Sequence, residues 1–259
     1  VTTSDVTAAT SLYVTPYGGE RIALYDGSGT WVMYSFSEIT ISLSGQTADK
    51  NYDVFLYDSG GTVVAETVVW TSDTARATAL AVQDGVYVKS GTTTKRYIGT
   101  YRTTTTIGQC EDSVSNRYVW NYYNRVSRAL FKRDTTDSWT YTTSSWRSWN
   151  NSTANRVNFV VGVNEDPVSL LFTCVIATSG IAINGSIGIG VDSTSTPSGI
   201  FTLAATNTLI GSIQATYTDL AGVGFHYLQL LEYGATTITY RGDNGGTAMQ
   251  SGAVGTIAA

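Results

Sequence analysis

Short runs in which apolar and polar residues alternate with a period of two recur along the whole chain, and turn residues separate them. Ile39, Ile41 and Leu43, for example, alternate with Thr40 and Ser42. Successive side chains of a β-strand point to opposite faces, so a period of two is typical of strands rather than helices. The pattern predicts an all-β fold.

Two glycine-containing turns define hairpins in the first part of the chain. Residues 26–29 read Asp-Gly-Ser-Gly, and residues 58–61 read Asp-Ser-Gly-Gly. Glycine adopts positive φ at little steric cost, which is what tight hairpin turns require. The turns join strands that we predict at residues 21–25, 30–36, 52–57 and 62–70.

One segment departs from the alternation and favours a helix. The Ala-rich residues 74–83 follow Asp73, whose side chain is suited to cap a helix, and Asp84-Gly85 follows them. We therefore predict one short helix in an otherwise β-rich chain.

The chain is long enough for two β domains, and a change in composition suggests where they meet. Four consecutive threonines at residues 103–106 precede a second block rich in aromatic residues. We predict an N-terminal β domain over residues 1–105, a junction over 106–117 and a C-terminal domain over 118–259. Residues 118–259 contain about nine predicted strands at the short, regular spacing of a β-sandwich, and we expect a jelly-roll-like one.

The composition excludes several classes of protein. Only 14% of the 259 residues are charged, against about 25% in an average protein, yet there are 17 Tyr and 6 Trp. Many aromatic residues and a net charge of −5 indicate a folded chain rather than a disordered one. Sparse Lys and Arg argue against binding to nucleic acid, which needs clustered cations. No apolar run is long enough to insert into a membrane.

An aromatic block in the second part of the chain supplies the candidate contact residues. Aromatic rings stack on sugars, but aromatic side chains in strands also fill cores and subunit interfaces. Both interpretations stay open at this point, with core or interface the favoured one. The candidate residues for glycan or interface contact are Trp120, Tyr122, Tyr123, Trp139, Tyr141, Trp146 and Trp149.

Residues suited to catalysis or metal binding do not form a recognisable pattern. His226 is the only histidine, no G-x-S-x-G nucleophile motif occurs, and most acidic residues fall in turns where Asp bonds its own backbone. We expect no enzymatic activity, no metal site and no cofactor. Cys110 and Cys174 either form one disulfide or remain buried thiols, and the second alternative is favoured.

Several short motifs together resemble β-rich structural proteins of tailed bacteriophages and prophages, of the tail-fibre, minor-tail and head-decoration kind. No single motif is specific, and it is their order over roughly residues 13–252 that carries the resemblance. The motifs are TPYGG at 15–19, IALYD at 22–26, KNYDVFLY at 50–57, QDGVYVKS at 83–90, RYIG at 96–99, VWNYYNRV at 119–126 and GDNGG at 242–246.

The resemblance implies a structural virion protein, either a head decoration, a head fibre or a tail-fibre subunit. Such a protein would lie on the surface of an extracellular particle and would pack as a homo-oligomer, most simply a trimer, against itself and other virion proteins. The alternative function is a lectin-like module that recognises a host-surface glycan. Family resemblance alone does not fix function, so both remain hypotheses at the level of sequence.

Overall fold

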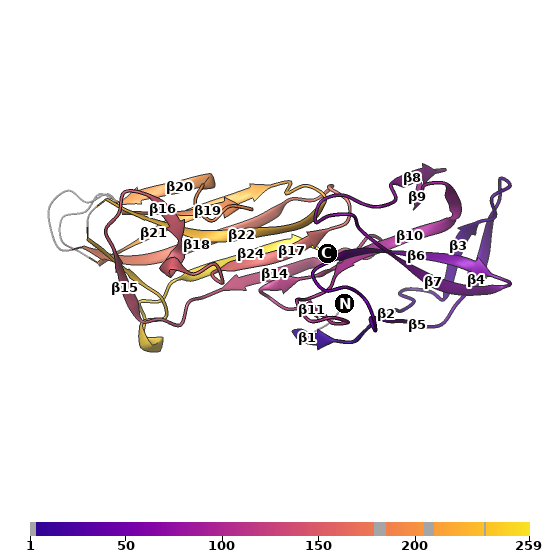
Figure 1. Ribbon diagram of the computed structural model, residues 1–259, viewed down its shortest axis with the longest axis horizontal. Helices are drawn as coiled ribbons and strands as arrows, with labels where there is room; N and C mark the ends of the chain where they lie inside the picture. The colour runs from indigo at the N-terminus through magenta and orange to yellow at the C-terminus, as the bar shows by residue number, and fades with distance from the viewer. Residues whose placement is uncertain (1–3, 179–184, 205–209, 236) are drawn as a thin grey trace.

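The computed structural model of the chain describes residues 4–178, 185–204, 210–235 and 237–259. Within these ranges the regular secondary structure consists of β-strands, with two short 3-10 turns, η1 (Trp149–Asn151) and η2 (Asn244–Gly246). The all-β prediction is confirmed. The molecule is elongated, with the early strands at one end and the later strands at the other (Figure 1). Among the described residues, no helix has the length and apolar character needed to cross a membrane.

The early strands form one six-stranded sheet and two small hairpin-like pairs. The sheet has the order β7-β6-β10-β9-β8, and β13 pairs with the second part of β10. The pairs β2–β5 and β3–β4 lie outside it. The bounds are β1 (Val6–Ala9), β2 (Ser11–Val14), β3 (Arg21–Tyr25), β4 (Trp31–Ser35), β5 (Ile39–Ser42), β6 (Asn51–Ser59), β7 (Thr62–Val69), β8 (Leu80–Gln83), β9 (Val86–Lys89), β10 (Thr92–Arg102) and β13 (Val119–Asn121).

Both predicted hairpins are present. β3 pairs with β4 from Tyr25 opposite Trp31, and the Asp26 carboxylate accepts hydrogen bonds from the backbone N–H groups of Ser28 and Thr30. β6 pairs with β7 down to Ser59 opposite Thr62, so residues 60 and 61 form a two-residue turn, both with positive φ. Glycine at both positions is what this turn requires.

The predicted helix over residues 74–83 is wrong. Residues 80–83 form strand β8 and the residues before them form a turn. The Asp73 carboxylate binds Arg102 instead of capping a helix, and the Asp73 carbonyl accepts from the Phe225 N–H. A helix of this length is marginal by itself, so these contacts with distant residues decide the conformation.

The later strands form a two-layer β-sandwich. One layer has the order β17-β22-β19-β20, with β16 beside the far end of β22, and the other has the order β14-β24-β18-β21, with β23 and β15 beside the far end of β18. β20 also pairs with β21 at residues 200 and 216, so the two layers are joined at this edge into one 14-stranded sheet. Their bounds are β14 (Ser127–Lys132), β15 (Ser138–Tyr141), β16 (Trp146–Ser148), β17 (Arg156–Val161), β18 (Val168–Thr178), β19 (Gly185–Val191), β20 (Ser198–Ala204), β21 (Ile210–Asp219), β22 (Gly224–Gly234), β23 (Ile238–Arg241) and β24 (Gly252–Ala258). Three of the strands that alternation predicts in residues 118–259, at residues 181–191, 208–217 and 236–241, lie partly outside the described residues.

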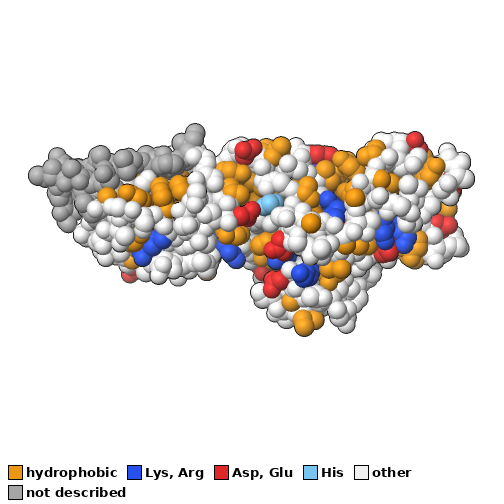
Figure 2. Space-filling view, turned by 45° about the horizontal axis from the view of Figure 1, so that its top comes forward, with side chains coloured by type: hydrophobic (Ala, Val, Ile, Leu, Met, Phe, Trp, Pro, Cys, Tyr) orange, Lys and Arg blue, Asp and Glu red, His pale blue; other side chains and the backbone are white. Residues whose placement is uncertain are grey.

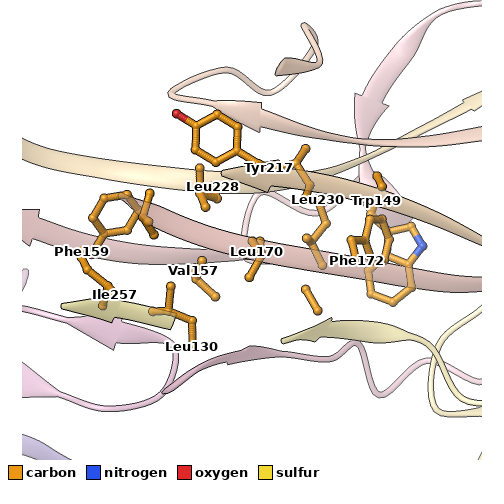
Figure 3. Close-up of a cluster of buried hydrophobic side chains, with 14 of the residues drawn as sticks. Leu130, Trp149, Val157, Phe159, Leu170, Phe172, Tyr217, Leu228, Leu230 and Ile257 are labelled. Atoms are coloured by element: carbon orange, nitrogen blue, oxygen red, sulfur yellow. The ribbon is translucent and has the colours of Figure 1, made fainter. Parts of the chain in front are cut away.

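The sandwich core lies between the two layers, as Figure 3 shows. Leu228 and Leu230 of β22 face Leu170 and Phe172 of β18, and all four are buried. Leu130 of β14 belongs to the same hydrophobic cluster. Because alternate residues of each strand point inward, the intervening residues of these strands must point away from the core.

The sequence pattern did not predict β14 and β24, which pair along six residues. β24 reads GAVGTIA, which lacks the bulky alternation of a typical strand. Gly255 explains part of this, because a Cβ there would clash with the Ser169 carbonyl of β18. The strand needs a glycine where the two backbones approach each other closely.

The interval predicted as a domain junction contains β11 (Cys110–Asp112) and β12 (Asn116–Arg117), which extend the first sandwich sheet through β17. β1 also joins this sheet by pairing with β11, whereas β13, which follows the interval, belongs to the six-stranded sheet. Phe55, Tyr97 and Trp120 share one hydrophobic cluster with the sandwich core. The chain therefore crosses between the two halves more than once, and independent folding of two domains stays a prediction.

Candidate functional site

The seven aromatic candidate residues form two separate groups. Trp120, Tyr122 and Tyr123 lie where the six-stranded sheet meets the sandwich, and the Tyr122 ring contacts the other two at centroid distances of 6.1 and 4.9 Å. Trp120 is buried and Tyr122 is half-buried, but Tyr123 is 46% exposed. Only Tyr123 presents a large part of its ring to solvent in this group.

The second group lies within and beside the sandwich core. The Trp149 ring is fully buried and packs edge-on against Trp139 and Phe172, with centroid distances of 5.1 and 5.0 Å. Tyr141 is buried as well, and Trp146 is half-buried against Tyr233. These side chains support the fold, and they do not form one sugar-stacking platform with the first group.

A buried carboxylate, Glu232, forms a hydrogen bond with one member of the second group, Trp139. Its two oxygens accept hydrogen bonds from Trp139 Nε1 and Arg147 Nε, each at 2.7 Å. Burial raises the pKa of Glu232 above its usual range, and the two donors act in the opposite direction. Because both oxygens are occupied by these structural partners, Glu232 is held as part of the core.

A second buried carboxylate, Asp53, ties the two halves of the molecule together. Arg76 donates to both Asp53 oxygens, at 2.7 and 3.2 Å, and also to the Gly162 carbonyl in the sandwich half at 2.6 Å. Thr100 donates a further hydrogen bond to Asp53 at 2.7 Å. Burial raises the pKa of Asp53, and Arg76 lowers it.

His226 is buried and contacts residues of the fold. Its Nδ1 lies 2.7 Å from an Asp192 oxygen, its ring packs against Phe159, and it is only 5% exposed. Cys110 and Cys174 are unpaired buried thiols in β11 and β18, and burial raises the pKa of each to about 12. Neither thiol is ionised near neutral pH, so neither is an activated nucleophile. No group of three or more His, Cys, Asp or Glu in the described ranges is arranged to hold a metal ion.

The outward-pointing residues of β14, β24, β18 and β21 form the feature that the sequence did not reveal, and we call this surface the outer face. Pairing registers place Phe131, Val254 and Leu171 in one row across three adjacent strands. Phe131 and Val254 are 37% and 52% exposed. The outer-face residues are Ala129, Phe131, Ser169, Leu171, Thr173, Val175, Ser212, Gln214, Thr216, Thr218, Val254 and Thr256.

None of these outer-face residues carries a charge. Arg128 and Lys132 of β14 alternate with its outer-face residues, and Arg133, just after the strand, lies over the Phe131 ring. Charged groups are also scarce elsewhere: the view in Figure 2 is mostly uncoloured or apolar, with Lys, Arg, Asp and Glu in a few small groups. The outer face is therefore a continuous surface of apolar and hydroxyl-bearing side chains.

A groove beside Tyr123 is the second surface feature. It has a volume of about 640 Å³ and lies between β10 and β13 on one side and residues 12–23 on the other. Its lining includes Tyr13 and Tyr17, which are 60% and 83% exposed. No sequence signal predicted it, because the fold brings it together from five separate stretches of the chain.

No protein-family model matches this sequence, and no curated protein matches it. Solved structures show loose similarity only. A structure of the infectious bursal disease virus Gt strain has a TM-score of 0.33 and 10% identity, covering 98% of this chain and 76% of that one. The infectious bursal disease virus VP2 subviral particle has a TM-score of 0.29 and 11% identity, covering 97% and 74%.

Proteins of other kinds are similar to the same degree. BuGH86wt in complex with neoagarooctaose has a TM-score of 0.28 and 8% identity over 95% of this chain. The chain spans only 34% of that protein and 24% of latent PorU from Porphyromonas gingivalis. Similarities this weak define no family and assign no function.

Proposed function

We propose that this chain is a structural protein of a virus particle, packing against copies of itself and against other particle proteins. The observation that carries the proposal is the uncharged outer face. Five of the twelve outer-face residues are apolar, seven are uncharged polar residues, and none is charged. Interface cores are depleted of charged residues, and the row of Phe131, Val254 and Leu171 contains none.

The more specific assignment, a head-decoration, head-fibre or tail-fibre subunit of a tailed bacteriophage, rests on the ordered sequence motifs. It places the chain on the surface of an extracellular particle. Identical subunits usually close into a cyclic oligomer, and the same resemblance favours three copies. The chain then acts through packing and surface contact.

This role requires no catalysis, and we propose that the chain is not an enzyme. Among the buried acidic groups of the described residues, Asp53, Asp112 and Glu232 are each engaged by arginine side chains. Asp134 accepts hydrogen bonds from the Asn150 and Asn155 amides. We expect the purified protein to release no fragments from bacterial capsule or cell-wall polysaccharide. Release that disappears when a single Asp or Glu is substituted would contradict this proposal.

Self-association through the outer face is testable with one substitution. One chain has a mass of 27.7 kDa. We expect light scattering of the wild-type protein at micromolar concentration to give the mass of two or more chains. Val254→Asp buries a charge in the interface and should reduce the mass to that of one chain. Val82→Asp is the matched control, because Val82 is 63% exposed on β8 in the other half of the molecule.

The proposed interface is wrong if Val82→Asp dissociates the oligomer as effectively as Val254→Asp. If the wild-type protein has the mass of one chain at every concentration tested, the proposal that it self-associates is wrong.

Glycan recognition is the second candidate function, and the groove beside Tyr123 favours it. Exposed tyrosine rings along a groove can stack on sugar rings, with polar groups nearby to bind hydroxyls. This role is compatible with a position on a particle surface.

A further inference from the structure

The Arg96 guanidinium lines the groove beside Tyr123 and is held in place by two hydrogen bonds. Arg96 of β10 donates from Nε to the Tyr123 hydroxyl and from Nη1 to the Ala23 carbonyl, both at 2.9 Å. Its guanidinium carbon lies 4.4 Å from the centre of the Tyr123 ring. In the described part of the chain, Nη2 has no hydrogen-bond partner, so a donor remains for a ligand.

The charge of the groove is opposite to that of the whole protein. The chain has a net charge of −5, yet the charged residues that line the groove are Arg21 and Arg96, and none of the described lining residues is Asp or Glu. The adjacent Glu38 accepts a hydrogen bond from Thr15 at the rim. A concave surface lined by one sign of charge concentrates ligands of the other sign.

The remaining lining suits a sugar. Tyr13, Tyr17 and Tyr123 are all exposed. Tyr13 and Tyr17 each offer a ring face and a hydroxyl, whereas Arg96 already engages the hydroxyl and one side of the ring of Tyr123. The Asn121 side-chain oxygen accepts from the N–H groups of Tyr123 and Asn124, which orients its amide and leaves Nδ2 as a donor. Aromatic faces with a few fixed polar groups are typical of small-ligand sites.

We propose that this groove binds an acidic oligosaccharide, with Arg96 pairing a sugar carboxylate and the exposed tyrosines stacking on the sugar rings. The guanidinium geometry matches a carboxylate, and Arg96 is already fixed before the ligand arrives. The proposal rests on the glycan-binding candidate and specifies its ligand class. It does not depend on the particle role.

Titration calorimetry with oligosaccharides of hyaluronan, polygalacturonate and polysialate tests the proposal, with each probe's carboxyl-reduced counterpart measured in parallel. We expect at least one acidic probe to bind with millimolar or better affinity. The reduced form should bind at least tenfold more weakly. Arg96→Gln should cause a similar loss, because it removes a charge-assisted hydrogen bond.

Arg133→Gln is the matched control, since it removes the same charge from an arginine that lies over Phe131 at the end of the outer face. It should leave the affinity unchanged. Tyr17→Ala should weaken binding while the thermal midpoint stays the same, because Tyr17 is 83% exposed.

If the acidic and reduced probes bind with equal affinity and Tyr17→Ala abolishes this binding, the groove binds glycans but does not select acidic ones. That result would contradict the proposed ligand class. Lack of binding to all probes would overturn both. If Tyr17→Ala instead abolished self-association, the groove would be a protein interface and the proposal would be wrong.

Discussion

Replacing Trp149 with alanine is expected to remove about 3–5 kcal/mol from the free energy of unfolding. The side chain is fully buried in the sandwich core between Trp139 and Phe172. Alanine would lose the buried apolar surface and leave a cavity that rigid neighbouring strands cannot fill. For a chain of this size, this corresponds to a fall in the thermal midpoint of roughly 6–20 °C.

Tyr17→Ala is the control for this substitution, because it removes a large aromatic ring that is mostly exposed. It should change stability by no more than about 0.5 kcal/mol. Denaturant unfolding followed by fluorescence measures both. A loss below about 1 kcal/mol for Trp149→Ala would mean that Trp149 is not part of a close-packed core.

Arg76→Met is expected to cost about 3–5 kcal/mol, because it leaves the Asp53 carboxylate buried without its cation. It also removes the hydrogen bond from Arg76 to the Gly162 carbonyl, which connects the two halves of the molecule. Lys95→Met is the control, since Lys95 pairs with Glu66 at a partly exposed site. Such pairs contribute at most about 1 kcal/mol.

The loss of unfolding free energy caused by Arg76→Met should increase as the pH rises. Burial raises the folded-state pKa of Asp53 above its unfolded value. The folded protein therefore binds more protons than the unfolded chain at pH values between the two, and stability falls as the pH rises through this window. Removing Arg76 removes the main influence that lowers this pKa. The variant should therefore lose more stability at pH 7 than at pH 5, relative to wild type.

Adding Asp53→Asn to Arg76→Met should recover part of the loss at pH 7 and remove the extra pH dependence. Urea titrations of the three proteins at the two pH values measure this. The same deficit for Arg76→Met at both values would show that the uncompensated Asp53 charge is not the cause.

The sequence predicts those elements whose structure is set by nearby residues. The turn at Gly60-Gly61 and the strands β5 and β6 depend on local backbone geometry and side-chain direction, and all three are observed. The segment after Asp73 was mispredicted because Arg102 and Phe225, which are far along the chain, determine its conformation. β24 was not predicted because Gly255 fits a close approach to β18, and Gly252 one to β14, that only the folded molecule creates.

The candidate site was predicted only in part. An aromatic block was visible in the sequence, but which of its residues are buried depends on strand pairing. Trp149 and Tyr123 look equivalent as sequence, yet one is fully buried and the other is 46% exposed. The outer face requires the register of four strands, and the groove requires Arg96 to meet Tyr123 and Ala23.

The most direct test of the particle role is a cryo-electron microscopy map of the intact particle that contains this chain. We predict several copies of the chain arranged about a symmetry axis on the particle surface. The row of Phe131, Val254 and Leu171 should lie against a neighbouring chain in that map. Particles without the chain, or with this row facing solvent in every copy, would contradict the proposed function.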